Sequence, residues 1–161
     1  MSMQIDPRCK KLNELTDRYH QLFSQLGERY ILQLSREHGL KDDLVFGDFA
    51  FLSTVEDGGP DPVSMANVAK KLGINPSTAT RRVNKLLENG LVTKSNAADD
   101  DRRYDIRLTE AGSTLVRQMG DRLYAAVQKT YENVTEKEMQ TVYRYLDKCI
   151  DQLVILVRNK E

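Results

Sequence analysis

The stretch Ile74–Val92, INPSTATRRVNKLLENGLV, decides the fold of this chain of 161 residues. Asn75 is a favoured N-cap residue, and Pro76 suits the first position of a helix, where its missing N–H is harmless. Gly90 is typical of the residue that ends a helix. The predicted helix Pro76–Asn89 has an apolar side that must face a core, formed by Ala79, Val83, Leu86 and Leu87. Its opposite side carries small hydroxyl and basic side chains, so the two sides of this helix differ in chemistry.

The outer side of this helix is basic, although the formal net charge of the whole chain is zero. Between Lys70 and Lys94 the single acid Glu88 stands against six basic residues, namely Lys70, Lys71, Arg81, Arg82, Lys85 and Lys94. Small hydroxyl groups let the first turn of a helix approach a phosphate or a base edge, and arginine can grip guanine or phosphate with two bonds. We therefore expect a nucleic-acid-binding face on which the cations are exposed together; an ordinary solvated helix face is the alternative. The candidate residues on this helix are Ser77, Thr78, Thr80, Arg81, Arg82 and Lys85.

The segments on both sides of this helix complete a recognisable motif. A short helix, Ser64–Leu72, ends at Gly73, which gives helix-turn-helix order. Leu91–Ser95 and Tyr104–Leu108 read as two strands of a hairpin with a polar tip. Arg102 and Arg103 lie near that tip, and an arginine on a thin β-ribbon can enter the minor groove of DNA, where the negative potential is high. A solvated turn of mixed charge is the alternative for the tip.

Long amphipathic helices flank this centre. Apolar side chains recur at spacings of three and four from about Arg8 to Glu37 and again from about Asp43 to Glu56. Thr109 caps a helix that runs to about Tyr131, and the capping-box spacing of Thr135 and Glu138 opens a helix from Glu136 to about Val157. The apolar stripes of the terminal helices either pack on each other within one chain or form a dimer interface, and we favour the dimer.

These patterns predict a mainly α fold with a small β-wing. The winged helix-turn-helix domain is expected at 43–109, and the N- and C-terminal helices at 1–42 and 110–161 are expected to form a dimerisation region.

Several classes of function are disfavoured by the composition. The chain has only two cysteines, Cys9 and Cys149, and two isolated histidines, His20 and His38. This set is too small for a disulfide framework or a zinc cluster, so a reducing cytoplasm is expected. Neither a signal peptide nor an apolar run long enough to span a bilayer is predicted. We see no Gly-rich phosphate loop, no metal-ligand cluster and no nucleophile–base pair, so we expect no enzyme activity, no cofactor and no catalytic or metal-binding residue.

The ordered set of motifs resembles the multiple-antibiotic-resistance regulator (MarR) family of winged-helix transcription factors. The resemblance covers most of the chain and rests on VAKKLGINPSTATRRVNKLLENGLV, on an acidic-then-basic wing and on RLTEAG. The family pattern falls on Leu91, Val92, Asp100, Arg102, Leu108, Thr109 and Gly112. An alternative alignment places Asp101, Arg102 and Arg103 on the wing motif, so both arginines are kept as candidates.

The resemblance implies a homodimer that binds a pseudo-palindromic operator in double-stranded DNA, with helix Pro76–Asn89 in the major groove and a wing arginine in the minor groove. We expect a repressor, because occupancy of the operator can exclude polymerase, and the resemblance implies that a small lipophilic or phenolic effector releases it. An effector pocket is expected to use aromatic residues, and core packing explains the same residues equally well: Tyr19, Phe23, Tyr30, Phe46 and Phe49. Basic neighbours favour a thiolate at Cys9, but an inert thiol is the simpler interpretation. A protein-interaction module that presents its basic helix to an acidic partner is the competing function.

Overall fold

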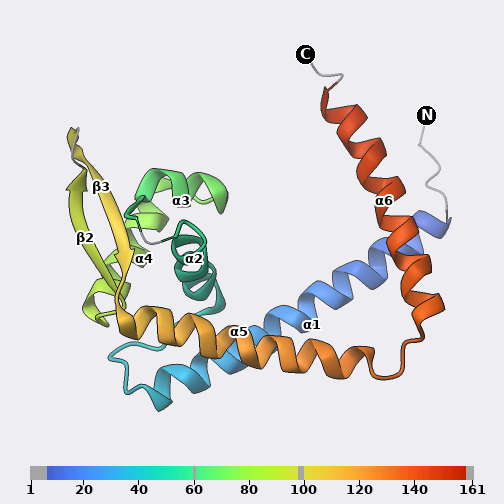
Figure 1. Cartoon of the computed structure of the whole chain (residues 1–161), viewed down its shortest axis with the longest axis horizontal. Helices are drawn as coiled ribbons and strands as arrows, with labels where there is room; N and C mark the ends of the chain where they lie inside the picture. The colour runs from blue at the N-terminus through green and yellow to red at the C-terminus, as the bar shows by residue number, and fades with distance from the viewer. Residues whose placement is uncertain (1–6, 60, 98–99, 159–161) are drawn as a thin grey trace. The chain divides into compact units, whose positions relative to one another are not determined.

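The computed structural model describes residues 7–59, 61–97 and 100–158, and it describes side chains at 10–59, 61–96 and 104–155. Figure 1 shows the elements in chain order. They are α1 (Pro7–Glu37), α2 (Phe46–Glu56), β1 (Val63–Ser64), α3 (Met65–Lys71), α4 (Pro76–Glu88), β2 (Val92–Ala97), β3 (Asp100–Leu108), α5 (Glu110–Tyr131) and α6 (Glu136–Arg158). This is the mainly helical fold with a small β-wing that the sequence predicts.

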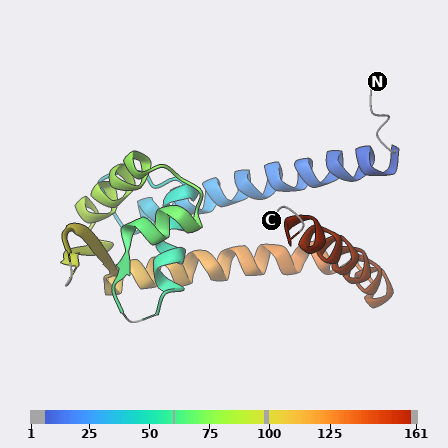
Figure 2. The same ribbon diagram turned by 90° about the horizontal axis from the view of Figure 1, so that it is seen from above.

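The chain divides into two compact units, Met1–Leu123 and Tyr124–Glu161. In the first unit α2, α3 and α4 gather beside the sheet, as the teal and green helices in Figure 2 show. One core joins them to the C-terminal end of α1 and the start of α5. Its largest fully buried side chains include Ile31, Leu34, Phe51, Leu86, Ile106, Leu115 and Met119. Burial of these apolar groups is the main force that holds the unit together.

The sheet is antiparallel with the strand order β1-β3-β2. Val92 pairs with Leu108 and Asn96 with Tyr104, and the register shifts after Asn96. The β2–β3 hairpin extends beyond the helices (Figure 1). Strand β1, which pairs Val63 with Ile106, was not predicted because two residues are too short for a periodic pattern.

The local helix signals act as the sequence predicts. Asn75 Oδ1 accepts a hydrogen bond from Thr78 N at 2.8 Å, which caps α4. Gly73 and Gly90 adopt positive φ values of 63° and 67° after their helices. Thr109 Oγ1 accepts from Gly112 N at 3.1 Å at the start of α5.

The predicted helix Asp43–Glu56 begins later, at Phe46. Leu44 N donates to the buried Ser35 Oγ at 3.1 Å, and Val45 is extended with φ −105° and ψ 160°. The Asp48 carboxylate accepts from Val45 N at 3.1 Å and so satisfies the backbone of the residue just before the helix. A tertiary contact with α1 therefore sets this boundary.

The second unit contains the end of α5 and helix α6. Thr135 N donates to Glu138 Oε2 at 2.8 Å and Glu138 N donates to Thr135 Oγ1 at 3.4 Å, which is the predicted capping box. In the part of the chain that the structure describes, no helix is both long enough and apolar enough to cross a membrane.

Candidate nucleic-acid interface

The outward face of α4 presents a small set of polar side chains. Ser77, Thr80, Arg81 and Asn84 are exposed, whereas Thr78 is half-buried. Ser77 Oγ donates to Asn75 Oδ1 at 2.8 Å, and Thr80 Oγ1 donates to the Pro76 carbonyl oxygen at 3.0 Å. Both hydroxyl groups thus use their proton within the helix and keep oxygen lone pairs on the outside.

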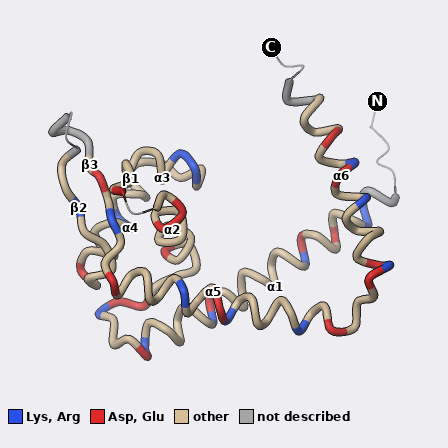
Figure 3. Tube along the Cα trace, viewed as in Figure 1, with Lys and Arg blue, Asp and Glu red and all other residues tan. Residues whose placement is uncertain are grey.

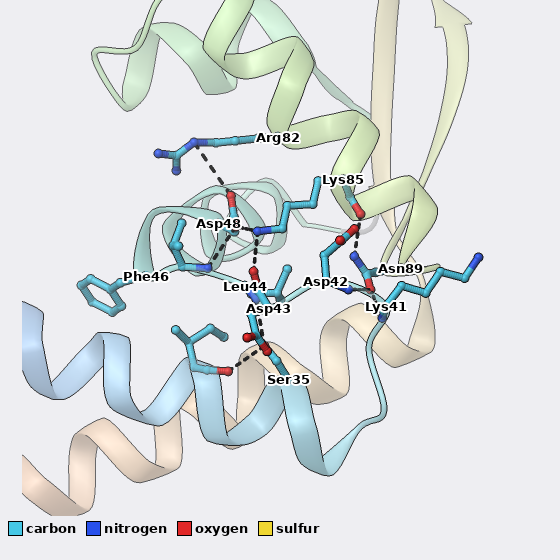
Figure 4. A network of polar contacts seen from close by, with 12 residues as sticks. Ser35, Lys41, Asp42, Asp43, Leu44, Phe46, Asp48, Arg82, Lys85 and Asn89 are labelled. Atoms are coloured by element: carbon cyan, nitrogen blue, oxygen red, sulfur yellow. Dashed lines mark hydrogen bonds and ion pairs between the residues drawn. The ribbon is translucent and has the colours of Figure 1, made fainter.

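The other two cations of α4 lie differently, as Figure 4 shows. Lys85 Nζ donates to Asp48 Oδ2 at 3.0 Å and to the Asp43 carbonyl oxygen at 2.6 Å. Arg82 Nε lies 4.0 Å from Asp48 Oδ1, and the side chains of Arg82 and Lys85 are only 20% and 26% exposed. The expectation that the three cations share an exposed face is therefore wrong for Arg82 and Lys85, because a buried carboxylate on α2 draws both inward.

The loop between α1 and α2 is fastened to the end of α4. Asn89 Oδ1 accepts from Lys41 N at 2.8 Å and from Asp42 N at 3.4 Å, while Asn89 Nδ2 donates to the Lys85 carbonyl oxygen at 2.8 Å. Sequence reasoning missed the roles of Asn89 and Asp48. A signal for Asp48 is present, since it is a lone acid in the apolar first turns of α2, FGDFAFL.

An open groove of about 890 Å³ runs between this loop and the outer face of α4. It is lined by Asp42, Asp43, Ser77, Thr80, Arg81, Asn84, Lys85 and Glu88. Acids thus stand beside the cations of α4. These acids partly cancel the positive potential near α4, so the positively charged surface is smaller than the count of basic residues in the sequence indicates.

Further basic residues lie outside α4. Lys70 is exposed at the end of α3, and this end of the helix is a basic stretch, drawn blue in Figure 3. Lys71 Nζ pairs with Asp57 Oδ2 at 3.1 Å, and Lys94 Nζ lies 3.5 Å from the ring centre of Tyr104 on the hairpin. The backbone of Arg102 and Arg103 belongs to β3, but the predicted side-chain contacts of both arginines lie outside the described residues.

Four of the five aromatic candidates form a row on α1 and α2. The ring centres of Tyr19 and Phe23 are 6.1 Å apart, those of Phe23 and Phe46 6.1 Å, and those of Phe46 and Phe49 5.6 Å. Tyr30 is half-buried and packs against the core. The row is exposed at one end, where Tyr19 has 50% of its surface accessible.

The isolated histidines and cysteines have ordinary surroundings. His38 Nε2 lies 2.7 Å from Gln118 Oε1, and the His20 ring meets the edge of Tyr19 at 6.0 Å. Cys149 is a half-buried free thiol, while the side chain of Cys9 lies outside the described residues. Among the described residues no group of three His, Cys, Asp or Glu side chains could hold a metal ion.

Comparisons with known proteins relate this chain to transcription regulators. Residues 38–103 match the model of the MarR family. A relative, the uncharacterized HTH-type transcriptional regulator YhjH of Bacillus subtilis (strain 168), is 31% identical over 83 residues. That alignment covers 52% of this chain and 46% of the relative, so the match spans about half the length of the relative.

The fold is also that of solved structures with this family name. Wild-type MarR from E. coli in its apo form has a TM-score of 0.70 and is 21% identical, covering 91% of this chain and 98% of that chain. A MarR-like transcription regulator from Bacillus cereus ATCC 10987 has a TM-score of 0.75 and is 18% identical, covering 92% and 99%. A MarR variant from E. coli complexed with operator DNA has a TM-score of 0.68 and is 20% identical, covering 91% and 99%. The match of residues 38–103 to the family model and the fold shared with these solved structures together make this chain similar to the MarR family of winged-helix transcription factors.

Proposed function

We propose that this chain is a sequence-specific, DNA-binding transcription regulator. The observation that carries the proposal is the outward face of α4, where exposed Arg81 stands beside the hydroxyl groups of Ser77 and Thr80. A helix with this face fits the major groove, and one structure of the same fold is a complex with operator DNA. We also propose that the regulator acts in the cytoplasm.

In this proposal each group on α4 has a distinct task. Arg81 reads a guanine with two hydrogen bonds, and the oxygens of Ser77 and Thr80 allow the helix to approach base edges closely. Thr78, next to the cap, lies near the backbone N–H groups of the first turn, which favour a phosphate. Lys70 and Lys94 add phosphate contacts, and Arg102 or Arg103 enters the minor groove.

We also propose that the regulator is a homodimer. Large apolar side chains on α1 remain exposed, namely Leu12, Leu15, Tyr19 and Leu22, and a second set lies on α6, namely Val142, Leu146, Ile150 and Leu153. Exposed apolar rows of this length are unfavourable in water and are typical of an interface. A second copy that covers them would place two α4 helices against a pseudo-palindromic site.

The mode of regulation completes the proposal. Occupancy of an operator excludes polymerase, so we propose a repressor. We further propose that a lipophilic or phenolic effector binds at the aromatic row of Tyr19, Phe23, Phe46 and Phe49, and that its binding releases the DNA. The stacked rings and the open end at Tyr19 support this assignment.

Selection of bound duplexes from a random pool tests the function. The full chain should enrich a roughly palindromic motif, and binding should weaken steeply with salt as counterions are released from phosphates. Replacing Arg81 with alanine should cost about 1–3 kcal/mol and relax the sequence preference at one position of each half-site. Arg18→Ala, on the exposed surface of α1, is the matched control. Enrichment of no motif at all would instead favour a protein partner for the basic helix.

A further inference from the structure

We propose that Asp48 is a positioning residue that keeps Arg82 and Lys85 away from DNA and thereby improves discrimination between operator and unrelated duplex. The proposal rests on the DNA-binding function proposed above. Asp48 lies on α2 and does not contact DNA itself. It affects DNA binding only by setting where the side chains of Arg82 and Lys85 lie.

Asp48 is the centre of a buried ionic cluster. Its side chain is 3% exposed, and Oδ2 accepts hydrogen bonds from Lys85 Nζ at 3.0 Å and from Val45 N at 3.1 Å. A carboxylate this deeply buried is tolerated only when partners compensate for its lost hydration. The two cations of α4 supply that compensation, so their inward orientation is coupled to the fold of α2.

Other contacts hold each cation in the same direction. Lys85 Nζ also donates to the Asp43 carbonyl oxygen at 2.6 Å. The guanidinium of Arg82 lies directly over Gly47, where a side-chain carbon would overlap it. The absence of a side chain at Gly47 therefore leaves space in which the planar group of Arg82 rests against α2.

This arrangement changes what α4 offers to DNA. Binding to any duplex depends mainly on the number of phosphates that cations neutralise, whereas specificity comes from groups that reach base edges. Asp48 holds two cations where they do not neutralise phosphates. Arg81 and the exposed polar groups of α4 remain available to contact base edges. Asp42 and Asp43 on the rim of the groove oppose phosphates in the same place.

The test measures the affinity of the full chain for its selected operator and for a random duplex over a series of salt concentrations. Asp48→Asn keeps the shape of the side chain and removes the charge that retains the cations. The random duplex should then bind more tightly, with a logarithmic salt slope steeper by about 1–2 for each bound protomer, since each new phosphate contact adds about 0.9. The ratio of operator to random affinity should fall by at least about fivefold, a change that loss of packing alone would not produce.

Two further variants make the result decisive. In the double variant Asp48→Asn/Lys85→Met, part of the extra salt dependence should disappear, because one released cation is gone. Lys85→Met alone should leave the slope of the random duplex unchanged, whereas Arg81→Ala should reduce it or relax the motif. Circular dichroism and thermal unfolding verify that each variant is folded. If Asp48→Asn does not fold, the salt slope that Lys85→Met shows with the random duplex tests the proposal instead.

Two results would overturn the proposal. One is that Asp48→Asn weakens operator and random duplex by the same factor with an unchanged slope. The other is that Lys85→Met by itself lowers the salt slope of the random duplex by about 0.9, as the loss of one phosphate contact would. A wild-type chain without any operator preference would refute the proposed function itself, which is a different outcome.

Discussion

Replacing Gly112 with alanine should destabilise the winged-helix unit. Gly112 is buried where α5 passes the end of α4, and an added Cβ would overlap the Leu91 carbonyl oxygen and lie 3.1 Å from the Leu91 carbonyl carbon. The neighbouring atoms are backbone and cannot rotate away. The Leu91 oxygen also accepts a hydrogen bond from Thr109 N at 3.0 Å, so a shift of α5 that relieved the overlap would stretch this bond.

The magnitude follows from three contributions. Inserting a carbon into this packed contact costs about 1–3 kcal/mol. Weakening a hydrogen bond to a buried carbonyl costs about 1–3 kcal/mol more. The higher helix propensity of alanine returns about 1 kcal/mol. Gly112→Ala should therefore lower the free energy of unfolding by about 1–5 kcal/mol.

Gly120 on the same helix is the matched control. It is exposed, has no heavy atom within 4 Å of an added Cβ, and is not among the glycines with positive φ. Gly120→Ala should raise the free energy of unfolding by about 0.5–1 kcal/mol. Both values come from urea unfolding at one fixed protein concentration, because association would stabilise the folded state. If Gly112→Ala is as stable as Gly120→Ala, the close approach of α5 to Leu91 is not present in solution.

Two further predictions concern local contacts. Asn75→Ala removes the cap of α4 and should lower the free energy of unfolding by about 1 kcal/mol in the same urea assay. Asn75→Ser should retain most of the wild-type stability, and equal losses for both variants would contradict the capping role. A hydrogen bond from Arg122 Nη2 at 2.6 Å and another from Gln33 lower the pKa of Glu37 from its usual value of 4.5. The ionised Glu37 carboxylate therefore stabilises the fold above pH 4.5, and this contribution is lost as the pH falls through the pKa of the folded state. Thermal unfolding between about pH 5 and pH 3 should thus depend less on pH in Glu37→Gln than in the wild type, and an identical pH dependence would show that this pair contributes nothing.

The sequence by itself determined where most helices begin and end. Asn75, Gly73 and Thr109 act on backbone groups within three or four residues, and such contacts require no knowledge of the rest of the chain. The apolar periodicity likewise located the core side of α4, where Ala79 and Leu86 are fully buried. The family pattern rests on these same local features, which is why the winged-helix fold could be predicted.

Only the tertiary structure decided which cations of α4 face outward. A helical wheel places Lys85 beside Arg81, but it describes where a side chain starts and not where its charged end lies. Asp48 is 37 residues from Lys85 in sequence, and the packing of α2 against α4 brings the carboxylate within 3.0 Å of the ammonium group. A buried charge must find a partner, and a long flexible side chain can reach back to provide one. The Asp48–Lys85 pair therefore depends on the fold of the whole unit and cannot be predicted from the sequence of α4 alone.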